Sequence, residues 1–152
     1  MKARSLICML AVAGLIFVTS SRADDESDPL KGITCPVSGK AAKADVTVDH
    51  KDGKIYMCCP GCPTAFANNT EKFAAKANHQ LVATGQYTQK ACPLTGRAHK
   101  DDKTVDASGV TVAVCCPGCL GKGNKAEDKI ALFFTDKAFD KGYEKKPAEE
   151  TE

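Results

Sequence analysis

The stretch CCPGC, residues 58–62, recurs unchanged as residues 115–119 of the same chain. A further cysteine precedes each copy, Cys35 before the first and Cys92 before the second, and both intervals have the same length. The whole cysteine pattern therefore repeats with an offset of 57 positions and no insertion. A repeat at a fixed period predicts two homologous units in tandem.

The residues around the cysteines repeat as well. The sequence CPVSGK begins at Cys35, and CPLTGR begins at Cys92. We predict a first module at residues 33–85 and a second module at residues 90–143. Aromatic residues make up only 6% of the 152 residues, so each module has few large side chains for a core and needs a staple. The nine cysteines of the chain can supply this staple.

Each module is predicted to contain a β-hairpin. In the first module, strand-like residues 46–49 and 54–57 flank an Asp-Gly pair, which is a strong hairpin signal. In the second module, residues 104–106 and 110–114 flank a Ser-Gly pair. The two hairpins occupy equivalent places, between the first cysteine and the CCPGC cluster.

A helix is predicted to follow each cluster. In the first module, apolar residues at helical spacing extend it through Asn78. In the second module, Gly121 and Gly123 weaken the helix start, which leaves short helices predicted at residues 129–134 and 136–142, the latter capped by the preceding threonine.

These elements are predicted to bring distant cysteines together. A hairpin returns the chain to its starting point, so Cys35 and Cys58 converge although 22 residues separate them, and Cys62 lies on the first turn of the next helix. Zinc and copper(I) both favour sulfur ligands, and a helix N-terminus favours the thiolate form. We therefore predict one zinc or copper(I) ion per module. The candidate ligands are Cys35, Cys58, Cys59 and Cys62 in the first module, and Cys92, Cys115, Cys116 and Cys119 in the second.

The spacing from Cys35 through Cys58 to Cys62, with Tyr56 just before the cluster and Phe66 just after it, resembles the TRASH and YHS family of small metal-binding modules. The resemblance implies a small α+β fold of two tandem treble-clef-like ββα modules. It also implies a role in trafficking, resistance or sensing of heavy metals such as copper and zinc.

The identity of a fourth ligand is left open by the sequence. Ser38 and Thr95 stand where treble-clef fingers have a second cysteine, and Cys59 and Cys116 are the natural substitutes. Adjacent residues on an ordered strand point in opposite directions, so both cysteines of a pair can bind one ion only if the chain turns there. The second module lacks the flanking tyrosine and phenylalanine, which predicts looser packing around its site.

The N-terminus has the pattern of a signal peptide. Lys2 and Arg4 precede an apolar run at residues 6–18, and a small-residue site predicts cleavage after Ala23. The run is shorter than the roughly 20 residues that a membrane-spanning helix needs. We therefore predict a signal peptide at residues 1–23 and a periplasmic or secreted protein that has no membrane association after cleavage.

Both ends of the mature chain are charged and poor in apolar residues, which predicts a disordered linker at residues 24–32 and a disordered tail at residues 144–152. Removing Lys2, Arg4 and Arg22 from the 21 basic residues leaves 18 against 19 acidic ones, a net charge of about −1. This balance predicts no nucleic-acid partner. The expected partners are metal ions and, for a trafficking role, another metal-handling protein.

The main alternative is a disulfide-stapled secreted interaction scaffold without metal, because the mature chain has an even number of cysteines. The paired cysteines favour metal, since a disulfide between adjacent residues is strained. The CPGC sequence is also a C-x-x-C pattern, which makes thiol–disulfide exchange a further alternative. A protein-interaction module in which zinc only replaces a hydrophobic core is the last alternative.

No catalytic constellation stands out, so we do not expect an enzyme. His50, His79 and His99 do not recur at the repeat offset and are expected to be solvated rather than ligating. Met57 precedes a cluster and offers a thioether that copper can bind, but its counterpart in the second module is Val114, so core packing is the expected role.

Overall fold

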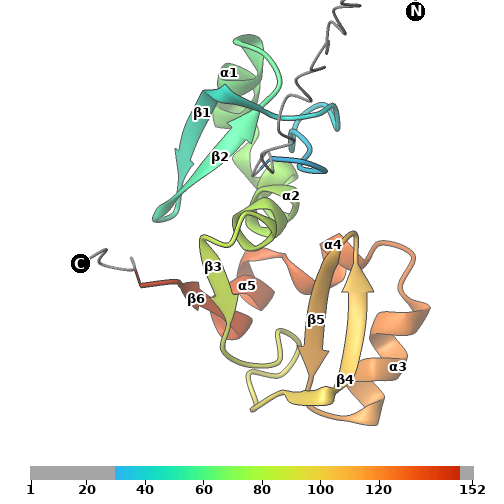
Figure 1. Ribbon diagram of the computed structural model, residues 1–152. Helices are drawn as coiled ribbons and strands as arrows, with labels where there is room; N and C mark the ends of the chain where they lie inside the picture. The colour runs from blue at the N-terminus through green and yellow to red at the C-terminus, as the bar shows by residue number, and fades with distance from the viewer. Residues whose placement is uncertain (1–29, 148–152) are drawn as a thin grey trace, which may run out of the picture.

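The structure is a computed structural model that describes residues 30–147. The predicted signal peptide lies outside the described residues, as do most of the predicted linker and the last five residues of the chain. Figure 1 shows a blue-green unit above an orange-red one, with helix α2 at the junction between them. None of the helices in the described part of the chain combines the length and hydropathy needed to cross a membrane.

The first module is a hairpin followed by two helices. Strand β1 (Lys43–His50) pairs antiparallel with β2 (Gly53–Met57), and helices α1 (Gly61–Asn68) and α2 (Thr70–Ala83) follow. Alternate residues of β2 are buried and face the core, as the period of a strand requires. The predicted hairpin is confirmed.

The second module repeats this order. Strand β4 (Lys100–Ala107) pairs antiparallel with β5 (Val110–Val114), and α3 (Pro117–Lys125) follows. Two short helices then complete it, α4 (Lys129–Phe133) and α5 (Asp136–Gly142). The small α+β class and the second hairpin are confirmed.

The repeat extends to the register of the strands. Lys43 pairs with Met57 in the first hairpin, and Lys100 pairs with Val114 in the second, at the same offset of 57 positions. Both ladders shift register immediately after that pair. The two modules therefore share the backbone irregularity as well as the strands.

The turn of the first hairpin differs from the prediction. Lys51 and Asp52 form the turn, with φ 52° at Lys51, and Gly53 is already the first residue of β2. A Cβ atom on Gly53 would lie 2.6 Å from Leu81 Cδ2. The glycine is needed because α2 packs closely over the strand, not because the turn requires it.

The prediction of a single helix after the first cluster is wrong, because Asn69 interrupts the helix and divides it into α1 and α2. Its backbone leaves the helical region at φ −144° and ψ 48°, and α2 then continues to Ala83. Thr70 Oγ1 donates a hydrogen bond to Phe66 O over 3.1 Å. Asparagine and threonine both have lower helix propensity than alanine or leucine, so two adjacent residues of these types favour a helix boundary.

The predicted weakening of the second helix is also wrong. Helix α3 includes both glycines, and a Cβ on Gly123 would lie 2.7 Å from Phe133 Cζ and 2.8 Å from Val105 Cγ2. The glycine thus allows α3 to pack closely on β4 and α4. Gly123 stands at the position equivalent to Phe66 of the first module, and the fully buried Phe133 lies beside it.

A third two-stranded sheet joins the ends of the modules. Strand β3 (Tyr87–Gln89) pairs antiparallel with β6 (Tyr143–Lys145), which lies beside it in Figure 1. Strand β3 lies in the segment between the predicted modules, and β6 extends two residues into the segment predicted as a disordered tail. The aromatic side chains of Tyr87, Phe139 and Tyr143 pack together nearby, with ring centroids 4.9–5.2 Å apart along that series.

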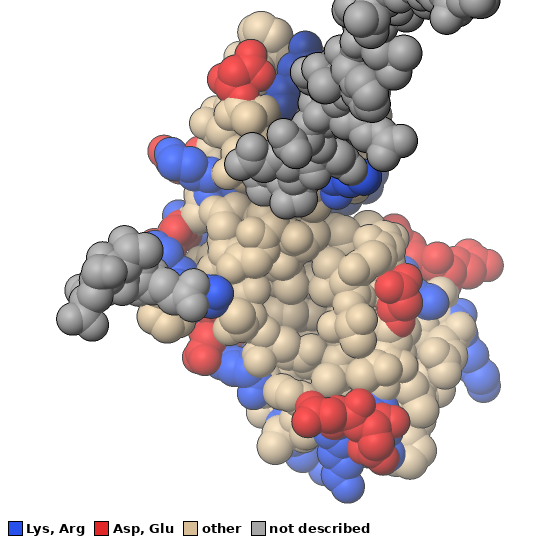
Figure 2. All heavy atoms as spheres, in the orientation of Figure 1, with Lys and Arg blue, Asp and Glu red and all other residues tan. Residues whose placement is uncertain are grey.

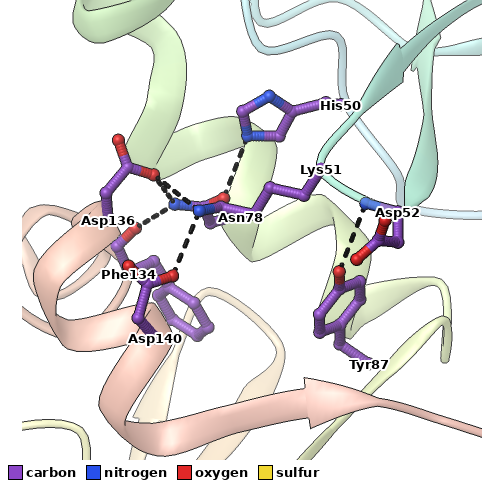
Figure 3. A network of polar contacts seen from close by, with 8 residues as sticks. All are labelled: His50, Lys51, Asp52, Asn78, Tyr87, Phe134, Asp136 and Asp140. Atoms are coloured by element: carbon purple, nitrogen blue, oxygen red, sulfur yellow. Dashed lines mark hydrogen bonds and ion pairs between the residues drawn. The ribbon is translucent and has the colours of Figure 1, made fainter.

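The buried apolar side chains of both modules form one continuous core. A polar network crosses the same boundary (Figure 3). The fully buried Asn78 of α2 donates hydrogen bonds to Phe134 O and to Asp136 Oδ1, both over 2.9 Å. Lys51 Nζ lies 3.3 Å from Asp136 Oδ1 and 3.2 Å from Asp140 Oδ1. On the face shown in Figure 2, basic and acidic groups are mixed around the periphery with uncharged surface between them.

Candidate metal centres

The first sulfur cluster consists of Cys35, Cys58 and Cys62, whose Sγ atoms all lie within 4.8 Å of one another. Cys35 precedes β1, Cys58 follows β2, and Cys62 lies in the first turn of α1. Because the hairpin returns the chain, two cysteines far apart in sequence meet a third on the helix. The Sγ atoms of Cys58 and Cys62 are 3.5 Å apart.

The second sulfur cluster repeats the first with Cys92, Cys115 and Cys119. These Sγ atoms also lie within 4.8 Å of one another, and those of Cys115 and Cys119 are 3.8 Å apart. All three residues are buried, whereas Cys58 in the first cluster is only partly buried. The convergence predicted from the repeat therefore occurs in both modules.

A tight turn holds the first cysteine of each cluster. Gly39 N donates to Cys35 O over 2.8 Å, and Gly96 N donates to Cys92 O over 2.7 Å. The two glycines have φ values of 72° and 74°, which a residue with a side chain adopts only at a cost. The glycine that recurs at this place in both modules is therefore explained by the backbone conformation of the turn.

A hydroxyl group contacts each cluster from the same turn. Ser38 Oγ lies 3.0 Å from Cys58 Sγ, and Thr95 Oγ1 lies 3.2 Å from Cys115 Sγ. Ser38 and Thr95 occupy equivalent places, three positions after the first cysteine of each module. The recurrence of a hydroxyl residue three positions after the first cysteine was the signal that could have revealed this role.

The protonation of the first cluster is uneven. Burial raises the pKa of Cys35, but hydrogen bonds from the backbone and side chain of Ser38 and from other backbone groups outweigh it and lower the pKa to about 7. The pKa of Cys62 rises to about 12, through its contact with Cys59, burial and the neighbouring Cys58 and Cys35 thiols. Thiolates this close repel one another, so full deprotonation of the cluster needs a cation.

The second cluster shows the same contrast. The pKa of Cys92 is lowered, because hydrogen bonds from Thr95 and backbone groups outweigh the effect of burial. The pKa of Cys119 rises to about 12, through burial and the neighbouring thiols. The electrostatics of the clusters repeat together with their geometry.

The second cysteine of each CC pair lies outside the clusters of mutually close sulfurs. Cys59 is exposed, and its Sγ lies 3.0 Å from Cys62 Sγ. Its pKa is lowered by contact with the Cys62 side chain and backbone, and that of Cys116 is lowered to about 7 by the backbone and side chain of Cys119. Six of the eight candidate ligands are therefore grouped in threes, and Cys59 and Cys116 flank the groups. All eight are free thiols in the structure.

The histidines were expected to be solvated, but His79 contacts the second module and His50 contacts Asn78 within the first. His79 Nε2 lies 2.9 Å from Ala107 O, and its ring packs edge-on against Phe134 at 5.0 Å. Burial lowers the pKa of His79. His50 Nε2 lies 3.1 Å from Asn78 Oδ1, as Figure 3 shows. Neither histidine belongs to a cluster of potential metal ligands in the described residues.

A cavity of about 430 Å³ borders the first cluster. Cys35 forms part of its wall, together with Lys76 and His79 of α2 and the Ser108–Gly109 turn of the second hairpin. The surroundings of the first cluster are therefore built from both modules.

The donor set suits a soft metal ion. Sulfur atoms that bind one ion tetrahedrally through bonds of about 2.3 Å lie about 3.8 Å apart. The separations of 3.5 Å and 3.8 Å within the two clusters are close to that value. Thiolates favour zinc and copper(I), and this set of donors fits either ion.

The chain matches no protein-family model, and no curated protein or solved structure is significantly similar to it. The two cysteine clusters are consistent with a metal-binding module. The resemblance to the TRASH and YHS family stays a prediction from the sequence.

Proposed function

We propose that the protein binds one soft metal ion, zinc or copper(I), at each sulfur cluster. The observation that carries this proposal is the convergence of Cys35, Cys58 and Cys62 within 4.8 Å, repeated by their counterparts in the second module. The raised pKa of Cys62 keeps its thiol protonated in the absence of a metal ion, so binding of an ion by three thiolates should release protons.

We further propose that the role is metal handling outside the cytoplasm, in trafficking, resistance or sensing, rather than catalysis. The support for export is the signal-peptide pattern, and the support for metal handling is the resemblance to TRASH and YHS modules, which also suggests a treble-clef-like arrangement. The exposed Cys59 thiol beside the buried Cys62 offers a place where a thiol of another metal-handling protein can exchange ligands.

The decisive experiment compares metal content with free thiols in protein purified without reductant. Metal binding predicts close to two zinc or copper ions per chain, with the cluster thiols becoming reactive only after chelation. Four disulfides and no bound metal would instead support the secreted scaffold without metal.

A second measurement separates a carrier from a structural role. If the metal is structural, chelation should unfold the modules, because small metal sites contribute folding free energy directly. If the protein is a carrier, its circular dichroism spectrum should persist after chelation, and the metal should transfer rapidly to a competing chelator.

A further inference from the structure

The two clusters differ in one buried sulfur atom. Met57, the last residue of β2, is fully buried, and its Sδ lies 3.7 Å from Cys35 Sγ. We propose that Met57 is a thioether ligand of the first centre, and that it gives this centre a preference for copper(I) that the second centre lacks. The proposal rests on the proposed function, since it assumes that the first cluster binds a metal ion.

The difference is confined to the side chain. Met57 pairs with Lys43 in the first hairpin, and Val114 pairs with Lys100 at the equivalent place in the second. Val114 is also fully buried and has no donor atom. The two modules thus present the same backbone position to their clusters, once with a thioether and once with a hydrocarbon.

The distance suits a shared ion. The separation of 3.7 Å between Met57 Sδ and Cys35 Sγ lies between the 3.5 Å and 3.8 Å found within the thiol clusters. It is also close to the value of about 3.8 Å for sulfur ligands of one tetrahedral ion. An ion bound by Cys35 can therefore lie within reach of the thioether.

The chemistry of the thioether favours copper(I). Thioether sulfur is a soft ligand of copper(I), whereas structural zinc sites use thiolate, imidazole and carboxylate ligands. The thioether is neutral, so it adds a fourth donor to three thiolates without adding negative charge to a buried site. Extra negative charge is costly where burial removes solvent.

The test is the substitution Met57→Leu in the full chain, because leucine keeps the volume and removes only the sulfur. Ile55→Leu is the matched control, since Ile55 is a fully buried residue on the same face of β2. Copper(I) affinity is measured anaerobically by competition with a chromogenic copper(I) chelator, and zinc affinity by competition with a zinc dye.

We expect Met57→Leu to weaken one of two copper(I) sites by on the order of tenfold and to leave zinc affinity unchanged. Ile55→Leu should change neither. Wild-type copper(I) affinity in Met57→Leu would overturn the role of Met57 while leaving the proposed function intact. Failure of the wild-type chain to bind either metal would refute the proposed function itself, and this proposal with it.

A second measurement does not depend on how the variant folds. The chain has three methionines, of which Met1 and Met9 lie in the predicted signal peptide and Met57 lies in the first module. In copper(I)-loaded selenomethionine protein, selenium absorption spectroscopy should detect a copper neighbour at bonding distance: on the single selenium of the mature chain, or on one of three if the signal peptide is retained. Selenium with carbon neighbours alone would show that Met57 only packs in the core.

Discussion

A hydroxyl group lies beside each sulfur cluster, three positions after its first cysteine. Ser38 Oγ contacts Cys58 Sγ and also accepts a hydrogen bond from Lys40 N over 3.3 Å. Thr95 makes the equivalent contact with Cys115. A hydrogen bond to a thiolate stabilises its charge and orients the sulfur, as groups around metal ligands commonly do.

This geometry predicts that Ser38→Ala weakens metal binding at the first centre by about tenfold, because the thiolate loses a hydrogen-bond donor. The matched control is Ser38→Thr, which installs the residue that the second module has at Thr95 and keeps the hydroxyl. Zinc competition titrations should place Ser38→Thr near wild type. Equal affinities for Ser38→Ala and wild type would show that the hydroxyl has no influence on the centre.

Helix α3 illustrates how packing can reverse the effect of a residue on a helix. Glycine lowers helix propensity, so a weak helix was expected here. In the structure, the absence of a side chain at Gly123 lets α3 lie close to Phe133 and Val105. A Cβ on Gly121, two residues earlier, would meet no atom within 4 Å.

The contrast gives a matched pair of substitutions. Gly123→Ala should destabilise the metal-loaded protein by about 1–3 kcal/mol, because overpacking exceeds the gain in helix propensity. Gly121→Ala should stabilise it by about 0.5–1 kcal/mol, since it gains helix propensity without a clash. Unfolding in denaturant would measure both, and destabilisation of equal size in the two variants would contradict the packing described for α3.

At the scale of the molecule, the two modules form one body. Helix α2 belongs to the first module by sequence, yet its residue Asn78 donates hydrogen bonds to Phe134 and Asp136 of the second module. Lys51 Nζ from the first hairpin lies near both Asp136 and Asp140 of α5, as Figure 3 shows. The turns and helices that carry the sulfur clusters are therefore held against a common core.

The ion pairs at this boundary predict a pH dependence. Burial would raise the pKa of Asp136, but the hydrogen bond from Asn78 and the charge of Lys51 lower it below its ordinary value of 3.8. Its stabilising effect should therefore be complete above about pH 4 and disappear as the pH falls through the lowered pKa. Burial would lower the pKa of Lys51, but Asp140 and Asp136 raise it above 10.5, so its contribution persists below that pH and is lost as the pH rises further.

The variant Asp136→Asn tests this dependence. The difference in unfolding free energy from wild type should be below about 1 kcal/mol near neutral pH, because the carboxylate is half exposed. It should shrink as the pH falls below the ordinary value of 3.8 and vanish below the lowered pKa of Asp136. Metal release by thiolate protonation affects both proteins and cancels in the difference. A difference that stays constant from pH 7 to pH 3 would contradict the role of the charge.

The sequence predicted what depends on local and repeated signals. The strand patterns indicated both hairpins, and the cysteine spacing indicated which sulfurs would meet. The break at Asn69 and the close approach at Gly123 depend on competing hydrogen bonds and on tertiary packing, which a helix pattern does not report. The hydrogen bonds of Asn78 join segments that are more than 50 residues apart in the sequence, and no repeated sequence pattern indicates such long-range bonds.

The most direct test is the number of metal ions per chain, counted by native mass spectrometry of protein loaded with zinc or copper(I). We predict two ions for wild type and for Cys59→Ser, and one ion for Cys62→Ser, whose sulfur belongs to the first cluster. Two ions retained in Cys62→Ser, or none in wild type, would contradict the claim that each cluster binds one ion.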